Sequence, residues 1–233
     1  MSRTDLLKGY VIHQRPMSDS RKILDIFTAQ AGRVTGVVRI SKKSPALILF
    51  QPYLFSWLGK QEFKTFTGYE SEAIPFALKA EQLYCGFYLN ELLQRLLPAL
   101  DESTELFAAY EMALAILANQ QPPEPHLRRF ELVLLRHLGY EYSFIHEGFN
   151  PTPLQANGLY HFNPQQGFVP ITTQSFDSPN KSGLEYSGAD ILAYHRGESS
   201  PAVLHLLKRV CRHAIAARLG REPLRSRELF RRD

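Results

Sequence analysis

Apolar and polar residues alternate along the first third of the chain, which is the period of strands with one buried face. From Gly32 to Ile40, for example, Val34, Gly36 and Val38 would share one face. Five strands are expected, over residues 9–14, 21–28, 32–40, 53–59 and 65–71. Five antiparallel strands in about 70 residues must protect their edges, and a small Greek-key barrel does so by closing. The pattern predicts an OB-like barrel, although an SH3-like barrel fits it nearly as well.

After Pro75 the apolar residues recur every three or four positions, which is the spacing of amphipathic helices. Ser103 is placed to cap the second of these helices, and Gly139 to end the third. A Ser200-Pro201 start and a Gly220 end would bound the last one. Four helices are expected, over residues 83–97, from 103 to about 117, from just after the proline-rich residues 122–125 to 138, and over 201–219.

Residues 140–187 contain five prolines and many single aromatic residues without a sustained period. They are expected to be irregular apart from one hairpin, in which residues 159–162 and 168–171 flank a turn. The predicted fold class is therefore α+β. A barrel domain would occupy residues 1–80 and a helical domain residues 81–233, with a loop-rich insertion at about 140–198.

Composition narrows the possible protein classes. With 44% hydrophobic residues the chain of 233 residues can bury a substantial core, which excludes global disorder. The only cysteines, Cys85 and Cys211, cannot form a disulfide framework or a cysteine-rich zinc site. No apolar run approaches the roughly 18 residues of a membrane span, and the N-terminus does not resemble a secretion signal. These features predict a cytoplasmic protein with no membrane partner.

The charged residues are sorted along the sequence. Residues 1–80 carry a net charge of +6, residues 81–200 of −8, and residues 201–233 of +6. Two basic ends around an acidic middle suggest a polyanionic partner, and nucleic acid fits better than a membrane because no basic amphipathic helix opens the chain. The alternative is that these charges only solvate the surface.

Sequence signatures of catalysis are absent. The chain lacks a phosphate-binding GxxxxGK[ST] loop, a dinucleotide-binding GxGxxG, a GxSxG elbow and an HExxH zinc motif. No two histidines are spaced to grip a metal on one helical face. A hydrolase using His146 and Glu147 is the remaining catalytic alternative, but adjacent residues of an extended chain point to opposite faces. No enzymatic activity, metal or cofactor is therefore expected.

Cations alternate with aromatic residues in the barrel segment. This combination suits single-stranded nucleic acid, because cations follow the phosphates while a ring stacks on any base. The candidate contacts on the barrel are Lys8, Arg15, Arg21, Lys22, Arg33, Arg39, Lys42 and Lys43. Arg209 and Arg212 on the last helix form a second, weaker candidate surface. Most of the rings must also build the core of the barrel, so only two or three are expected to be exposed.

Six stretches of the sequence resemble, in order, the RecO family of bacterial recombination mediators. They are YVIHQRPMSDSRKILDIFT from Tyr10, AGRVTGVVR from Ala31, FQPYLFSWLGKQEFKTF from Phe50, LYCGFYLNELLQRLLP from Leu83, LRRFELVLLRHLGY from Leu127 and PLRSRELFR from Pro223. The resemblance covers nearly the whole chain and is weakest over residues 146–200. It favours an OB fold over the SH3-like alternative.

This resemblance implies a protein that binds single- and double-stranded DNA, anneals complementary strands and, with RecR, helps RecA load on DNA coated by single-strand-binding protein. It would be associated with the nucleoid. Many relatives hold a zinc ion with four cysteines in the irregular segment, and residues 140–187 have none, so a zinc site is not carried over. The basic loop at residues 41–44 is also short. A generic OB-fold module that binds RNA or single-stranded DNA without a mediator role is the alternative.

The resemblance also implies that the acidic C-terminal tail of single-strand-binding protein is a ligand. A receptor for its terminal phenylalanine and carboxylate needs an apolar pocket rimmed by cations. Arg128 and Arg129 would lie in the first turn of a helix, where the helix dipole adds positive charge, and the resemblance favours Arg128. Phe107, Tyr110 and Leu132 are the expected walls, although they could equally belong to the core.

Overall fold

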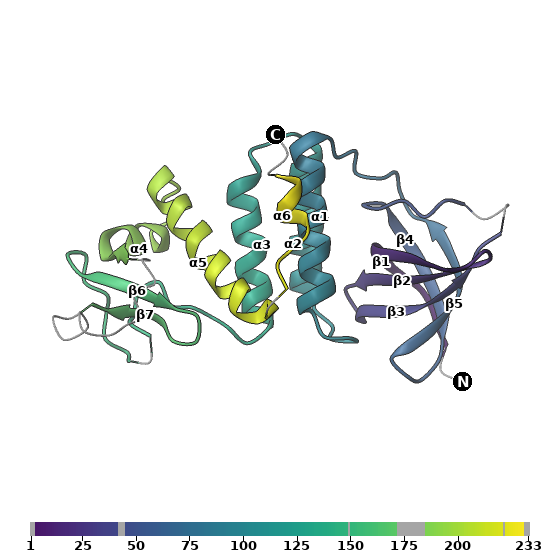
Figure 1. The fold of residues 1–233 in the computed structure, drawn as a ribbon, viewed down its shortest axis with the longest axis horizontal. Helices are drawn as coiled ribbons and strands as arrows, with labels where there is room; N and C mark the ends of the chain where they lie inside the picture. The colour runs from purple at the N-terminus through teal and green to yellow at the C-terminus, as the bar shows by residue number, and fades with distance from the viewer. Residues whose placement is uncertain (1–2, 42–44, 149, 172–184, 221, 231–233) are drawn as a thin grey trace. The chain divides into compact units, whose positions relative to one another are not determined.

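The computed structural model describes residues 3–41, 45–148, 150–171, 185–220 and 222–230 (Figure 1). By its internal contacts the chain forms two compact units. One contains Met1–Phe130 and Glu222–Asp233, and the other contains Glu131–Arg221. The barrel thus shares a unit with the helices that follow it. The division into domains of residues 1–80 and 81–233 stays a prediction.

Five strands close into a barrel at the N-terminus. They are β1 (Arg3–Ser18), β2 (Arg21–Thr28), β3 (Gly32–Arg39), β4 (Pro52–Leu58) and β5 (Phe63–Ser71), in the order β1-β2-β3-β5-β4. All neighbouring strands are antiparallel except β3 and β5, which are parallel. A closed five-stranded barrel of this kind, followed by helices, is an OB-type barrel in an α+β protein and confirms the predicted fold class.

Alternate residues of the strands fill the barrel. Leu24 and Ile26 of β2 and Val34 of β3 are fully buried there, together with the rings of β4 and β5. Gly36 belongs to the same inward series, and a Cβ at this position would collide with the backbone of Lys64 on β5. The missing side chain therefore allows β3 and β5 to approach closely enough to close the barrel.

Two helices, α1 (Ala80–Leu96) and α2 (Thr104–Ala118), cover part of the outer face of the barrel (Figure 1). The rings of Tyr10 and Phe27 point outward and meet those of Phe107 and Tyr110, with centroids 5.3–5.8 Å apart. All four residues are at most 6% exposed. Tyr10 also donates a hydrogen bond to Glu111 (2.7 Å), so its polar atom is satisfied inside the contact. This aromatic contact joins the barrel and α2 into one packed body.

Helix boundaries follow the capping residues. The Ser103 hydroxyl accepts a hydrogen bond from the Leu106 amide (3.2 Å) at the start of α2, as expected. The third helix, α3 (Pro123–His137), begins at Pro123, earlier than predicted. The proline-rich residues lie in its first turn, where a missing amide hydrogen costs no intrahelical bond. Gly139 follows the helix with a positive φ of 85°, which confirms it as the end signal.

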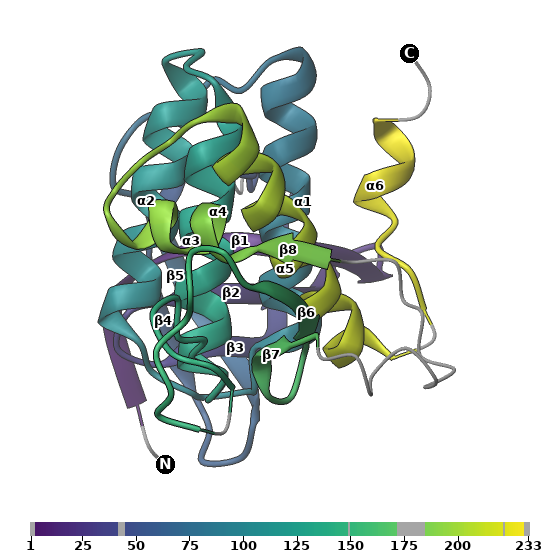
Figure 2. The same cartoon turned by 90° about the vertical axis from the view of Figure 1, so that its left-hand side faces the viewer.

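Besides the end of α3, the second unit contains a small sheet and two helices. Figure 2 shows β6 (Leu159–Asn163) between β7 (Gly167–Pro170) and β8 (Glu185–Ser187), and α4 (Gly188–His195) follows β8. The β6–β7 hairpin confirms the predicted one, whereas β8 and α4 lie in a segment that was expected to be irregular. Helix α5 (Pro201–Leu219) has the predicted Ser200 cap. No described helix is long and apolar enough to cross a membrane.

Aromatic side chains hold this unit together. The ring of Phe168 lies 5.4–5.9 Å from those of Phe144, Phe162 and Tyr186. The Arg218 guanidinium of α5 lies over the Tyr140 ring and donates to the carbonyl of Pro164.

A short C-terminal helix, α6 (Ser226–Leu229), belongs to the first unit, where the Glu91 carboxylate accepts hydrogen bonds from the amides of Arg225 and Ser226.

Candidate nucleic-acid interface

Three of the predicted contacts converge on the outer face of the barrel. Arg21 on β2 is directly opposite Arg39 on β3, so their side chains leave the sheet on the same side. Arg15 on β1 is opposite Ile23. Ile23 is two residues from Arg21 on β2, so both point to the outside of the barrel. The barrel interior takes the alternate residues Leu24 and Val38. We call Arg15, Arg21 and Arg39 the arginine face.

The arginine face is open. All three residues are exposed, and within the part of the chain that the structure describes none of them forms an ion pair. In the strand register they lie four or more residues from the Tyr10–Phe27 pair, and hence away from the α2 contact. OB barrels bind oligonucleotides on the face of strands 2 and 3 and with the β1–β2 and β4–β5 loops. Here α1 and α2 cover the part of the barrel surface around Phe27 and Arg33, and the arginine face remains exposed.

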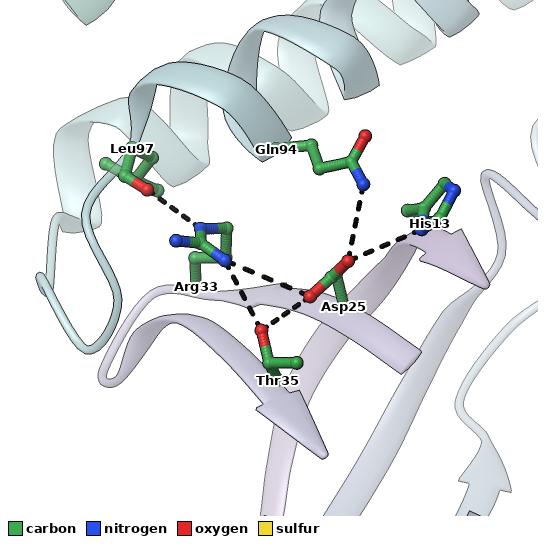
Figure 3. Close-up of polar contacts among 6 residues, drawn as sticks. All are labelled: His13, Asp25, Arg33, Thr35, Gln94 and Leu97. Atoms are coloured by element: carbon green, nitrogen blue, oxygen red, sulfur yellow. Dashed lines mark hydrogen bonds and ion pairs between the residues drawn. The ribbon is translucent and has the colours of Figure 1, made fainter. Parts of the chain in front are cut away.

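Arg33 has a different position from the arginine face. Its Nε donates to the carbonyl of Leu97 at the end of α1 (2.8 Å), and its Nη1 donates to the Thr35 hydroxyl (3.3 Å). The Thr35 hydroxyl in turn donates to the carboxylate of Asp25, which is 9% exposed. Figure 3 shows these residues between β2, β3 and the helix. Arg33 therefore fastens the barrel to α1 and has little freedom to follow a DNA strand.

Asp25 is the centre of this network (Figure 3). Its Oδ2 accepts a hydrogen bond from Gln94 of α1 (3.4 Å) and lies 3.4 Å from His13 Nδ1. Its Oδ1 lies 3.9 Å from Arg33 Nη1. The Asp25 carboxylate thus interacts with side chains of β1, β3 and α1. These contacts help to hold α1 against the barrel.

Lys8 and Lys22 are also engaged within the fold. Lys8 Nζ lies 2.8 Å from Glu111 of α2 and 3.5 Å from Glu72. The hydrogen bond to Glu111 raises the pKa of Lys8, which keeps this lysine charged and bound at the barrel–helix contact. Lys22 Nζ donates to the Gln14 side chain (3.1 Å) at the end of the barrel.

The remaining basic candidates lie elsewhere. Lys42 and Lys43 are outside the described residues. In the second unit, the Arg209 guanidinium lies 5.0 Å from the centroid of the Tyr186 ring, whereas Arg212 is exposed on α5. Lys60, which sequence reasoning did not select, is exposed in the loop between β4 and β5. Lys60 could have been selected from the sequence, because it lies in the turn before the fifth strand and this turn is a ligand-binding loop in OB barrels.

The residues expected to receive an acidic tail are mostly buried. Phe107 and Tyr110 are 6% and 0% exposed and form the aromatic contact with the barrel, so they present no open pocket wall. Arg128 is 6% exposed, Leu132 is half-buried and Arg129 is exposed. The tail site stays a prediction.

The described residues contain no cluster of metal ligands. Among the described residues no three His, Cys, Asp or Glu side chains are placed to hold one metal ion. Burial raises the pKa of the Cys85 thiol to about 12, so it is an unreactive core residue at neutral pH.

Comparison with known proteins assigns the chain to a family. The family model for the N-terminal part of Recombination protein O matches residues 1–74, and the model for its C-terminal part matches residues 78–228. This chain belongs to the Recombination protein O family. The N-terminal match coincides with the barrel that carries the arginine face, and membership confirms the resemblance found in the sequence.

Relatives of this Recombination protein O chain align with nearly all of it. A protein of Cellvibrio japonicus is 40% identical over 98% of this chain and 97% of its own length. A Haemophilus influenzae protein is 36% identical over 98% and 96%, and one from Pseudomonas paraeruginosa is 40% identical over 95% and 92%. Each is named DNA repair protein RecO, a name that specifies no catalysed reaction. Family membership thus supports a role in DNA repair.

Proposed function

We propose that this protein is a recombination mediator that binds single- and double-stranded DNA on the arginine face and anneals complementary strands. With RecR it would help RecA load on DNA coated by single-strand-binding protein. The observation that carries the DNA-binding part is the alignment of three exposed arginines on one open face of an OB-type barrel. Family membership supports the repair role.

The proposed mechanism is non-covalent. Arginines bind phosphates with charge-assisted hydrogen bonds and release condensed counterions, which supplies sequence-independent affinity. A basic surface that holds one strand also lowers the repulsion felt by a second strand, and this favours annealing. Contact with the coating protein would raise the local concentration of the mediator at the correct DNA.

An annealing assay tests this proposal. The full chain should accelerate pairing of complementary DNA strands, including strands coated with single-strand-binding protein, because both effects need only phosphate binding and recruitment. Complementary RNA strands and an uncoated DNA pair serve as controls. A protein that pairs RNA as well as DNA and is blocked by the coating protein would instead be the generic OB-fold module.

The acidic-tail contact is tested on α3. Arg128→Ala is expected to weaken binding of a fluorescent acidic peptide ending in phenylalanine by roughly tenfold to a hundredfold, the loss of one charge-assisted hydrogen bond. Arg129→Ala, which removes the same charge one position along the helix, is the matched control and should have a smaller effect. The prediction would be wrong if Arg128→Ala kept the wild-type peptide affinity. It would also be wrong if the variant lost annealing of uncoated DNA to the same extent as peptide binding.

A further inference from the structure

One aromatic side chain of the barrel is exposed to solvent. The barrel segment, residues 1–74, contains nine aromatic residues, of which seven are at most 4% exposed and Tyr69 is half-buried. Phe63, at the start of β5, is 49% exposed. Among the described residues its ring contacts no other ring. Phe63 is therefore the ring of the barrel with the largest exposed fraction, and it has a surface available to a ligand.

The strand register places Phe63 on the outer surface of the barrel, on the strand next to the one that carries Arg39. Phe63 is the partner of Thr35 in the parallel β3–β5 pair, and Thr35 has the outward parity of Arg39. Its neighbour Lys64 points inward and is 6% exposed, which fixes the outward direction of Phe63. Arg39 is four residues beyond Thr35 on β3, a separation of about 13 Å along the strand.

The charges near Phe63 fit a phosphate backbone. Arg21 and Arg39 lie toward one end of the face, and Lys60 is exposed in the loop that leads into Phe63. Glu62 is the acidic residue beside it in the sequence and is also exposed. A strand crossing from the arginines to this loop would pass the ring with cations on both sides.

We propose that Phe63 is a base-stacking residue that gives this site its preference for unpaired bases. The inference rests on the proposed DNA-binding function of the arginine face and names its preferred ligand as single-stranded DNA with accessible base faces. An aromatic ring stacks on any base and so adds affinity without sequence preference. In a duplex both faces of each internal base are already stacked. Duplex DNA is then held by the arginines alone.

Binding to three DNA probes tests this role. Anisotropy titrations would compare labelled oligo(dT), an abasic strand of the same length and a duplex. Phe63→Ala is expected to weaken oligo(dT) binding by roughly 5- to 150-fold, the effect of losing one stacked base, and to change abasic and duplex binding less than twofold. The salt slope for oligo(dT) should be unchanged, because no phosphate contact is lost.

Matched variants separate stacking from folding. Phe63→Tyr keeps a ring and should retain oligo(dT) affinity. Ile74→Ala shortens an 86%-exposed apolar residue outside the strands and should have no effect. In Phe63→Trp, oligo(dT) should quench the new indole, against a background from Trp57, which is 3% exposed.

Two results would overturn the inference. One is wild-type oligo(dT) affinity in Phe63→Ala. The other is an equal loss on the abasic strand, because the ring would then act through the fold. A different result would show that the proposed function is wrong. In that case, replacing the three residues of the arginine face by alanine would leave the slope of log affinity for oligo(dT) against log salt unchanged, whatever the effect of Phe63→Ala.

Discussion

Replacing Arg15, Arg21 and Arg39 together by alanine is expected to lower the affinity for single-stranded DNA about 100-fold at 0.1 M salt. Each phosphate contact contributes about 0.7 to the slope of log affinity against log salt on single strands. Loss of three contacts should therefore flatten that slope by about 2 and remove about two logarithmic units of affinity at this salt concentration. Anisotropy titrations of a labelled oligonucleotide between roughly 50 and 300 mM salt measure both quantities.

Two triple variants are the controls. Lysine at the same three positions keeps the charge and should preserve the slope, although bidentate phosphate contacts are lost. Alanine at Arg129, Arg196 and Arg225 removes the same charge from exposed positions off the arginine face. Equal flattening in this second variant would show a diffuse electrostatic effect. An unchanged slope in the arginine-face variant would place the DNA site elsewhere.

The sequence identified the barrel because local signals agreed there. Strand β2 has the predicted bounds, and β3 differs from its prediction by one residue at the end. Alternating Val34, Gly36 and Val38 could point inward only as a strand, and the turns supplied the boundaries. Ser103 and Ser200 likewise marked helix starts, since a capping hydroxyl is a short-range feature.

Which cations remain available for a ligand depended on contacts distant in sequence. Arg33 and Arg39 belong to the same strand and face, yet only Arg33 is held by the Leu97 carbonyl, 64 residues away. Lys8 is likewise held by Glu111. The sequence does not show such distant partners. Counting basic residues therefore cannot distinguish an arginine that is held within the fold from one that is exposed. The exposure of Phe63 has the same origin, because it requires the parallel pairing of β3 and β5.

The elements missed in the second unit have a similar cause. Strand β8 has three residues, too few to show a period, and it is stabilised by pairing with β6, more than 20 residues earlier. Helix α4 has eight residues and begins at a glycine, which weakens its intrinsic helix signal. Its Ser187 hydroxyl caps the Ala189 amide, but a single capping residue in a proline-rich segment predicts little alone. Tertiary pairing decides both elements.

Phe27→Ala is expected to lower the free energy of unfolding by about 3–5 kcal/mol, the usual cost of deleting a buried ring. Phe27 is 0% exposed and packs between Phe107 and Tyr110, so the cavity would open between the barrel and α2. Urea denaturation followed by fluorescence of Trp57, the single tryptophan, measures the loss in the barrel. Hydrogen exchange of α1 and α2 amides measures it in the helices.

Both measurements should report the same destabilisation, because the barrel and these helices share one contact unit and are joined by the Phe27 contact and the Asp25 network. Ile23→Ala, on the same strand and face but half-buried, should cost only about 1 kcal/mol. If Phe27→Ala lowered the Trp57 transition while α1 and α2 kept full protection, residues 1–80 would unfold as an independent domain. Coupled loss would instead mean that the barrel and these helices unfold as one cooperative unit.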